Sequence, residues 1–178
     1  MNTRRVVVTG MGMISPLGIG NDANWQALME GRSGIGRITR FDPKDFPCQI
    51  AGEVKGFHPE EWMEKKEVKK SDTFIHYALA AAQIAVDDSR LDLPRCDGER
   101  MGVIIGSGIG GLPLIEEMHT KLLERGPSRI SPFFIPGLIV NLAAGQISIR
   151  FGCKGPTSAP ATACATGATP GSGIKLKR

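Results

Sequence analysis

Apolar and polar residues alternate along the chain in blocks that predict strands and helices in turn. A β-branched run at 4–9 stops at Gly10, and a second apolar run at 101–105 stops at another glycine-rich loop; both are typical of buried parallel strands. The intervening segment 72–90 has apolar side chains at helical spacing: Phe74, Ile75, Ala78, Leu79, Ala82 and Val86. This spacing predicts a long helix, for which Ser71 is the expected N-cap.

The rest of the chain continues the same alternation. Three further helices are expected: one capped by Asn21 or Asp22 and closed by Gly31, one begun by Pro113, and one over 138–150 closed by Gly152. Residues 32–56 are punctuated by glycine and proline and predict an irregular segment, whereas 155–163 predict an extended approach to Cys164. The order of these elements indicates an α/β fold with a mixed, mostly parallel sheet.

The composition is that of an ordinary globular domain. Of the 178 residues, 41% are hydrophobic and 22% are charged, which suffices for one domain with a core and excludes a disordered chain. The net charge of +4 fits an acidic partner, but no basic run is interleaved with aromatic residues, so nucleic acid is not expected to bind. No apolar run reaches the length of a membrane span and the N-terminus does not resemble a secretory signal, so we expect a cytoplasmic protein.

The cysteine and histidine residues form no pattern of metal ligands. Cys48, Cys96, Cys153 and Cys164 are widely separated, without a CxxC pair, and are expected to be reduced thiols. His76 falls among apolar residues of the long helix and is interpreted as a hydrogen-bonded packing residue. We therefore predict no metal site.

Glycine-rich loops follow both predicted strands and raise the hypothesis of dinucleotide binding. Gly106, Gly108 and Gly111 match the GxGxxG pattern, in which backbone amides approach a pyrophosphate at a helix N-terminus. The context argues against this hypothesis, because no further strand carries an acidic residue about 20 positions on to bind a ribose. Tight turns between strands and helices explain the glycines, and no cofactor is expected.

Cys164 is the strongest candidate for chemistry. The residues around it, 161–167, are small and permit a sharp backbone turn and the approach of a bulky acyl group. At a helix N-terminus, unpaired amides would stabilise its thiolate and could hold an oxyanion. The residues alone leave two interpretations open, a nucleophile and a buried structural cysteine.

A series of motifs carries a resemblance to a known family. In order along the chain they are RRVVVTGMGMISPLG, FDPKDFPCQIAGEV, KKSDTFIHYALAAAQIAVDDS, GVIIGSGIGGL, ISPFFIPGLIVNLAAGQISIRFGCKGP and ATACATGA. The chain resembles the N-terminal part of the β-ketoacyl-[acyl-carrier-protein] synthases, most of all synthase II of bacterial fatty acid elongation. The resemblance covers 1–168 as a partial N-terminal domain and leaves 169–178 as a tail that does not match the family.

The resemblance implies the N-terminal half of a thiolase-like fold and a decarboxylating condensation of an acyl thioester with malonyl-acyl-carrier protein. Cys164 would be the nucleophile that accepts the acyl chain, and its amide would form half of the oxyanion hole. The resemblance places Ala163, Ile109, Phe133 and Phe134 at the acyl pocket, and the two phenylalanines in a segment that contacts the second subunit. It implies neither a metal nor a dinucleotide cofactor.

The resemblance also implies partners. Acyl carrier protein is acidic, and the segment that contains Lys65, Lys66, Lys69 and Lys70 is expected to meet it, with electrostatic steering as the physical role of these charges. The intact members of the family form homodimers, so a second copy of the subunit is the other expected partner.

The C-terminal residues depart from the family pattern. Two catalytic histidines, a lysine and a phenylalanine loop of the family's second half have no counterpart here, and Pro170 with its neighbouring glycines interrupts the helix expected after Cys164. We expect a chain truncated just after the cysteine, with an apolar face left uncovered and no condensation activity by itself. The alternatives are a non-catalytic fragment and an interaction module without turnover.

Overall fold

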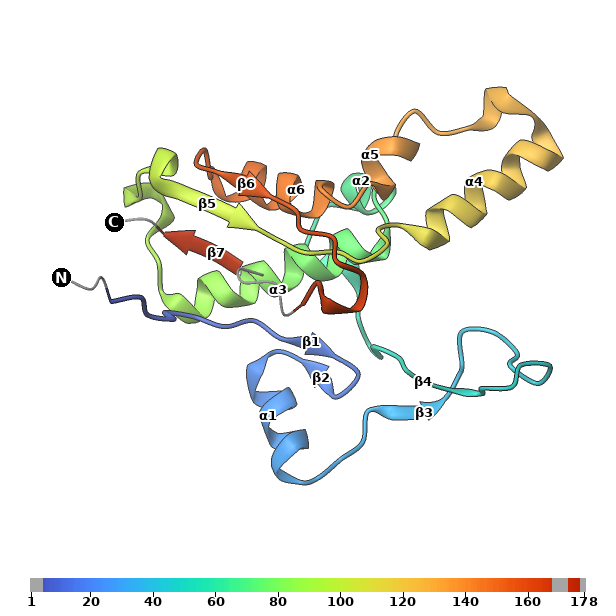
Figure 1. Cartoon of the computed structure of the whole chain (residues 1–178), viewed down its shortest axis with the longest axis horizontal. Coiled ribbons are helices and arrows are strands. Elements are labelled where there is room, and N and C mark those ends of the chain that lie inside the picture. The colour runs from blue at the N-terminus through green and yellow to red at the C-terminus, as the bar shows by residue number, and fades with distance from the viewer. Residues whose placement is uncertain (1–4, 168–172, 177–178) are drawn as a thin grey trace. The chain divides into compact units, whose positions relative to one another are not determined.

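The structure, a computed structural model, describes residues 5–167 and the backbone of 173–176. Its α-helices are α1 Asn21–Met29, α2 Lys65–Val68, α3 Thr73–Ser89, α4 Leu112–Arg125, α5 Phe134–Leu138 and α6 Leu142–Phe151. Its strands are β1 Ile14–Ser15, β2 Gly18–Ile19, β3 Ile35–Arg37, β4 Ile50–Gly52, β5 Met101–Ile104, β6 Thr157–Ser158 and β7 Gly173–Leu176 (Figure 1). The chain divides into two compact units: a first unit of 1–58 and 83–91, and a second unit of 59–82 and 92–178.

The first unit is built from two short antiparallel ladders and α1. Ile14 pairs with Ile19 in the β1–β2 ladder, and Gly36 pairs with Ala51 in the β3–β4 hairpin. Asn24, in α1, is almost fully buried, and its side-chain amide donates to the carbonyls of Gly18 and Gly20 at 2.9 and 2.7 Å. These bonds satisfy the buried amide and fix the β1–β2 turn against the start of the helix.

A buried carboxylate holds the base of the β3–β4 hairpin. Glu53 accepts hydrogen bonds from the Thr39 hydroxyl at 2.7 Å and from the amides of Thr39 and Arg40 at 3.1 and 3.2 Å. The Thr39 hydroxyl bond, followed by the Thr39 amide bond, lowers the pKa of Glu53 from its ordinary value of 4.5. The hairpin is therefore tied at this point by the ionised form of the carboxylate.

The hairpin should weaken in acid. Because the pKa of Glu53 is lower in the folded chain, its contribution to stability is present above 4.5 and is lost as the pH falls through the folded value. The Thr39 amide chemical shift should titrate with a midpoint below 4.5, and Glu53→Gln should abolish that titration while the matched variant Glu61→Gln leaves it intact. A midpoint at or above 4.5 would contradict the hydrogen-bonded carboxylate.

The second unit contains a mixed three-stranded sheet in the order β6-β5-β7 (Figure 1). Strand β5 pairs in parallel with β6, with Val103 opposite Thr157, and antiparallel with β7, with Met101 opposite Leu176. Helix α6 packs against β5 and β6. The core of this unit includes Ile75 of α3, Met101 and Val103 of β5, and Ile147 of α6, each at most 2% exposed.

Helices α4 and α5 form a pair within the second unit (Figure 1). The carboxylate of Asp72 accepts a hydrogen bond from the Leu114 amide at 2.8 Å, so it satisfies one of the unpaired donors in the first turn of α4. The Asp72 amide in turn donates to the Gly137 carbonyl of α5 at 3.1 Å. Asp72 thus ties the chain before α3 to both helices of the pair.

The predicted strand at 4–9 is wrong for the residues that the structure describes. No strand is assigned over 5–13, and Val6, Val7 and Val8 are 90, 65 and 80% exposed. A β-branched run becomes a strand only when another strand pairs with it, and both edges of β5 are already paired with β6 and β7. The strands β3 and β4 inside the irregular segment, and β7 in the tail, were not predicted.

The helices expected from the sequence are present, but some of their bounds and caps differ from the prediction. The helix expected over 138–150 is α6, which begins four residues later than predicted, and the short helix α5 that precedes it was not predicted. Gly152 ends α6 in the left-handed conformation, with φ of 67°. Gly20 rather than Asn21 or Asp22 is the N-cap of α1, without a side-chain cap bond, and the Asn21 amide donates to the Met11 carbonyl at 2.8 Å. Proline in the first turn of α4 and Gly31 after α1 lie where they were predicted.

Candidate functional site

Cys164 lies in a sharp turn that ends the segment following β6. The turn is a short 3-10 helix, Ala163–Ala165, and the cysteine side chain is exposed. Ala163 has φ of 49°, a left-handed conformation that costs a residue with a side chain roughly 1–2 kcal/mol. The structure therefore places the thiol on a tight, accessible turn, and the interpretation of Cys164 as a buried structural cysteine is wrong.

The helix expected after the cysteine falls partly on residues 168–172, which lie outside the described part of the chain. The three-residue turn by itself supplies no row of free amides of the kind found at the start of a long helix. Stabilisation of the thiolate by a following helix stays a prediction.

The glycine loop that follows β5 packs directly against the cysteine turn. A Cβ atom on Gly106 would overlap the methyl group of Thr166, and one on Gly108 would lie 3.4 Å from the Ala163 carbonyl oxygen. Further along the loop, a Cβ on Gly111 would lie 2.9 Å from the Leu138 Cα. The glycines allow close approach of protein segments to one another, so their presence is explained without a bound pyrophosphate.

The residues expected at the acyl pocket fall into two groups. Ile109 belongs to the glycine loop that touches the turn of Ala163 and Cys164, and its side chain is 70% exposed. Phe133 and Phe134 lie at the start of α5, with Phe133 41% exposed and Phe134 half-buried. The assignment of these side chains to an acyl pocket stays a prediction.

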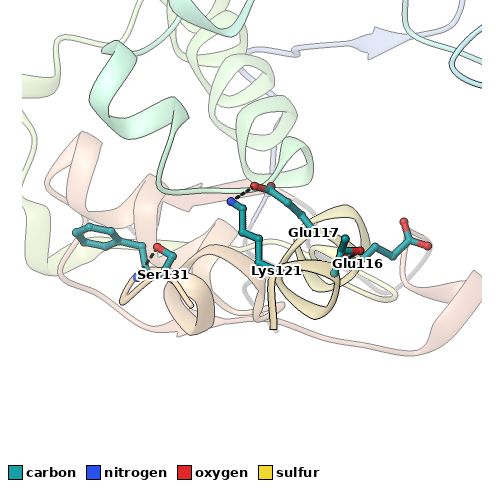
Figure 2. Close-up of polar contacts among 6 residues, drawn as sticks. Glu116, Glu117, Lys121 and Ser131 are labelled. Atoms are coloured by element: carbon teal, nitrogen blue, oxygen red, sulfur yellow. Dashed lines mark hydrogen bonds and ion pairs between the residues drawn. The ribbon is translucent and has the colours of Figure 1, made fainter. Parts of the chain in front are cut away.

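The second group adjoins a shallow cavity of about 130 Å³. It is lined by Lys69, Lys70, Leu114, Glu117, Met118, Lys121, Ser131 and Phe133. The Lys70 ammonium lies 4.5 Å from the centre of the Phe133 ring, a cation–π contact. Figure 2 shows Lys121 paired with Glu117, so Lys69 and Lys70 dominate the charge of this surface.

The four lysines expected to meet a carrier protein differ in their surroundings. Lys66 forms an ion pair with Glu64 at 2.7 Å, and the hydrogen bond between them raises the pKa of the Lys66 amine and lowers that of the Glu64 carboxyl. Lys65 and Lys69 are exposed and form no ion pair within the described ranges 5–167 and 173–176. The positive charge of this segment is therefore most available at Lys65, Lys69 and Lys70.

The histidines are not part of either group. His76 is buried in α3, where burial lowers the pKa of its ring and Ser71 lies 3.1 Å from its Nε2 atom. This confirms the interpretation as a hydrogen-bonded packing residue. Among the residues that the structure describes, no cluster of histidine, cysteine and carboxylate side chains could hold a metal ion, and no helix is both long and apolar enough to cross a bilayer.

Sequence reasoning missed two polar residues that shape the site. Thr166 is buried beneath the cysteine turn, and Asp72 is buried between α4 and α5. For Asp72, its place at the N-terminal end of the predicted helix was a usable signal, since aspartate favours the start of helices. For Thr166 the sequence offers no signal, because its burial depends on the distant Gly106.

Comparisons with known proteins agree with this architecture. The model of the β-ketoacyl synthase N-terminal domain matches residues 3–172. The chain is 52% identical over 167 residues to 3-oxoacyl-[acyl-carrier-protein] synthase 2 of Vibrio harveyi, and 48% identical over 167 residues to the protein of the same name from Synechocystis. Each match covers 94% of this chain and 40% of the relative, so the chain spans less than half the length of these relatives.

Solved structures show the same fold. The ishigamide ketosynthase/chain length factor superposes with a TM-score of 0.79 and 32% identity, over 89% of this chain and 40% of that one. A β-ketoacyl synthase from Burkholderia phymatum has a TM-score of 0.75 at 24% identity, over 93% of this chain and 41% of its own. The fold is thus the N-terminal part of the thiolase-like ketosynthase fold, as predicted. The chain belongs to the β-ketoacyl synthase family, whose N-terminal domain it matches over residues 3–172.

Proposed function

We propose that this chain carries the acyl-accepting cysteine of a 3-oxoacyl-[acyl-carrier-protein] synthase that acts in fatty acid biosynthesis. The observation that carries the proposal is the exposed thiol of Cys164 on a sharp turn braced by the glycine loop after β5. The names of the relatives give the class of reaction. An exposed thiol among small residues leaves room for an acyl group to approach.

The first half of the proposed reaction is a thioester exchange. The Cys164 thiolate attacks the carbonyl carbon of an acyl thioester, the new carbon–sulfur bond forms, and the donor's carbon–sulfur bond breaks. The donor sulfur leaves as a thiolate and takes up a proton. The Cys164 amide would donate to the oxyanion, and Ala163, Ile109, Phe133 and Phe134 would contact the acyl chain.

The second half is the condensation carried out by the full-length protein. Malonyl-acyl-carrier protein loses carbon dioxide, and its carbanion attacks the acyl carbon held on Cys164. A carbon–carbon bond forms as the bond to the cysteine sulfur breaks, which regenerates the thiolate. A homodimer and a cytoplasmic location belong to the same proposal.

Intact mass after incubation with an acyl-carrier-protein thioester tests the proposed exchange. The full chain should gain the mass of one acyl group, and treatment with hydroxylamine should remove it because the new bond is a thioester. A mass that stays unchanged after prolonged incubation contradicts the proposal.

The exposed lysines of α2 and the residues after it form the proposed docking surface for acyl carrier protein. Lys65, Lys69 and Lys70 present positive charge, and an acidic partner would be attracted to it over about 8–10 Å at physiological salt. One solved relative in fold is a ketosynthase in complex with a type II PKS acyl-carrier protein. The cavity beside Lys69 and Lys70 adjoins this surface.

Reversing the charge of Lys69 should weaken the association with acyl carrier protein. We expect Lys69→Glu to raise the Kd by about tenfold at low salt, and by less at high salt, because screening weakens the interaction that has been lost. Fluorescence anisotropy of labelled carrier protein measures both values. Lys154→Glu makes the same change of net charge at an exposed residue that follows α6, and it should have little effect. Equal losses in the two variants would show that net charge, and not this surface, is responsible.

A further inference from the structure

Thr166 is the buried residue of an otherwise exposed turn. Its side chain and backbone are only 5% exposed, whereas residues 161–165 and Gly167 are exposed. Its hydroxyl accepts a hydrogen bond from the Thr162 amide at 2.8 Å and donates one to the Ala163 carbonyl at 2.7 Å. A single hydroxyl therefore bridges the two residues that precede Cys164.

The second of these bonds acts on the peptide group of the cysteine itself. The Ala163 carbonyl and the Cys164 amide belong to one planar peptide unit, so fixing the direction of the carbonyl fixes the direction of the N–H on the other side. The Ala163 carbonyl also accepts a hydrogen bond from the Thr166 backbone amide at 3.1 Å, so the hydroxyl is the shorter of two restraints on this peptide group. Ala163 itself has φ of 49°, a conformation that a residue with a side chain does not favour, so the turn needs such restraints.

The methyl group of Thr166 has a separate role. It occupies the space where a side chain on Gly106 would begin, so it packs on the backbone that continues from β5. This contact anchors Thr166 to the sheet, while its hydroxyl reaches back into the turn. Threonine supplies both groups, whereas valine keeps only the packing and serine keeps only the hydroxyl.

We propose that Thr166 is a positioning residue for the Cys164 nucleophile: its hydroxyl, anchored at Gly106, fixes the Ala163–Cys164 peptide and so sets the direction of the thiol and of the amide beside it. The proposal rests on the proposed function for the role of Cys164, but the geometry it describes belongs to the turn alone.

Alkylation of cysteines in the full chain tests this role. The rate of iodoacetamide labelling is measured for each cysteine by peptide mass spectrometry, in native buffer and in urea, for the wild type, Thr166→Val and Thr166→Ser. The labelling rate of exposed Cys48 is the internal reference for the reactivity of iodoacetamide in each buffer, and labelling of buried Cys153 reports any opening of the core. We expect the wild-type Cys164 rate, relative to Cys48, to differ from its value in urea.

In Thr166→Val the ratio of the Cys164 rate to the Cys48 rate in native buffer should become equal to the ratio in urea, while Cys153 stays protected. In Thr166→Ser the native ratio should remain different from the ratio in urea. Retention of the difference in Thr166→Val together with its loss in Thr166→Ser would assign the effect to methyl packing and overturn the proposal. Loss of the difference in both variants would show that the hydroxyl does not set the reactivity of Cys164 by itself, and would also overturn it, as would a wild-type ratio equal to that in urea or a valine variant that behaves as wild type. Exposure of Cys153 in the valine variant would show a general structural role and also overturn it. If these rates follow the expectation but no acyl group is transferred from an acyl thioester, the proposed function fails and the positioning role stands.

Discussion

Replacing Cys164 by serine is expected to abolish acylation of the chain by an acyl-carrier-protein thioester. A thiol is a far better nucleophile than a hydroxyl, and a serine hydroxyl without an adjacent base is a weak one. We expect the rate of acyl transfer to fall by at least about 100-fold. Quenched time points analysed by intact mass give the rate for the wild type and the variant.

The matched control is Cys48→Ser, which removes the thiol of the other exposed cysteine. Cys48 lies in the first unit and its thiol contacts the Ile50 carbonyl at 3.4 Å, so its removal leaves the cysteine turn of the second unit intact. The control should acylate at the wild-type rate. Comparable rates of acyl transfer in the wild type and Cys164→Ser would show that Cys164 is not the nucleophile of the proposed reaction.

Shortening Ile147 to alanine should have the largest effect on stability. Ile147 is fully buried in α6, the helix that packs against β5 and β6. Removing its buried carbons loses their transfer free energy and leaves a cavity, which we expect to lower the free energy of unfolding by about 3 kcal/mol. Small domains are stabilised by only about 5–15 kcal/mol, so the urea midpoint should shift markedly.

Ile149→Ala provides the comparison on the same helix. Ile149 is 75% exposed, so the same change of chemistry removes little buried surface and should alter the urea midpoint only slightly. Equal effects of the two substitutions would show that α6 does not pack as the structure describes.

Helices could be predicted from the sequence because their signals are local. The apolar spacing of α3, the proline in the first turn of α4 and the glycine after α6 each act within a few residues, and the structure confirms the elements they predicted. The N-cap of α1 was predicted less well, since Gly20 and not Asn21 or Asp22 occupies that position.

Strands were predicted less reliably than helices because each needs a partner. The apolar run at 101–105 forms β5, as predicted, and pairs in parallel with β6. The valine run before Gly10 has strong β-propensity yet no strand is assigned to it, whereas β3, β4 and β7 form from segments with weak patterns. Which edge pairs with which segment is decided by the whole fold, and propensity does not encode it.

The candidate site was predictable at its centre and not in its surroundings. The small residues around Cys164 predicted a sharp turn, which the structure shows, and the exposure of the cysteine excludes the buried alternative that the residues had left open. The contact between Gly106 and Thr166 spans 60 positions of the sequence, and the ion pair of Lys66 with Glu64 depends on side-chain orientation. Such long-range and conformational features come only from the folded chain.

The most direct test of the central claim is a competition among the four cysteines of the wild-type chain for one acyl donor. The full chain is incubated with a limiting amount of an acyl-carrier-protein thioester, digested, and its cysteine peptides are analysed by mass spectrometry. We predict that the acyl group is found on the Cys164 peptide and not on those of Cys48, Cys96 or Cys153. An acyl group distributed equally between Cys164 and Cys48 would show that exposure alone governs the reaction, and would contradict the account.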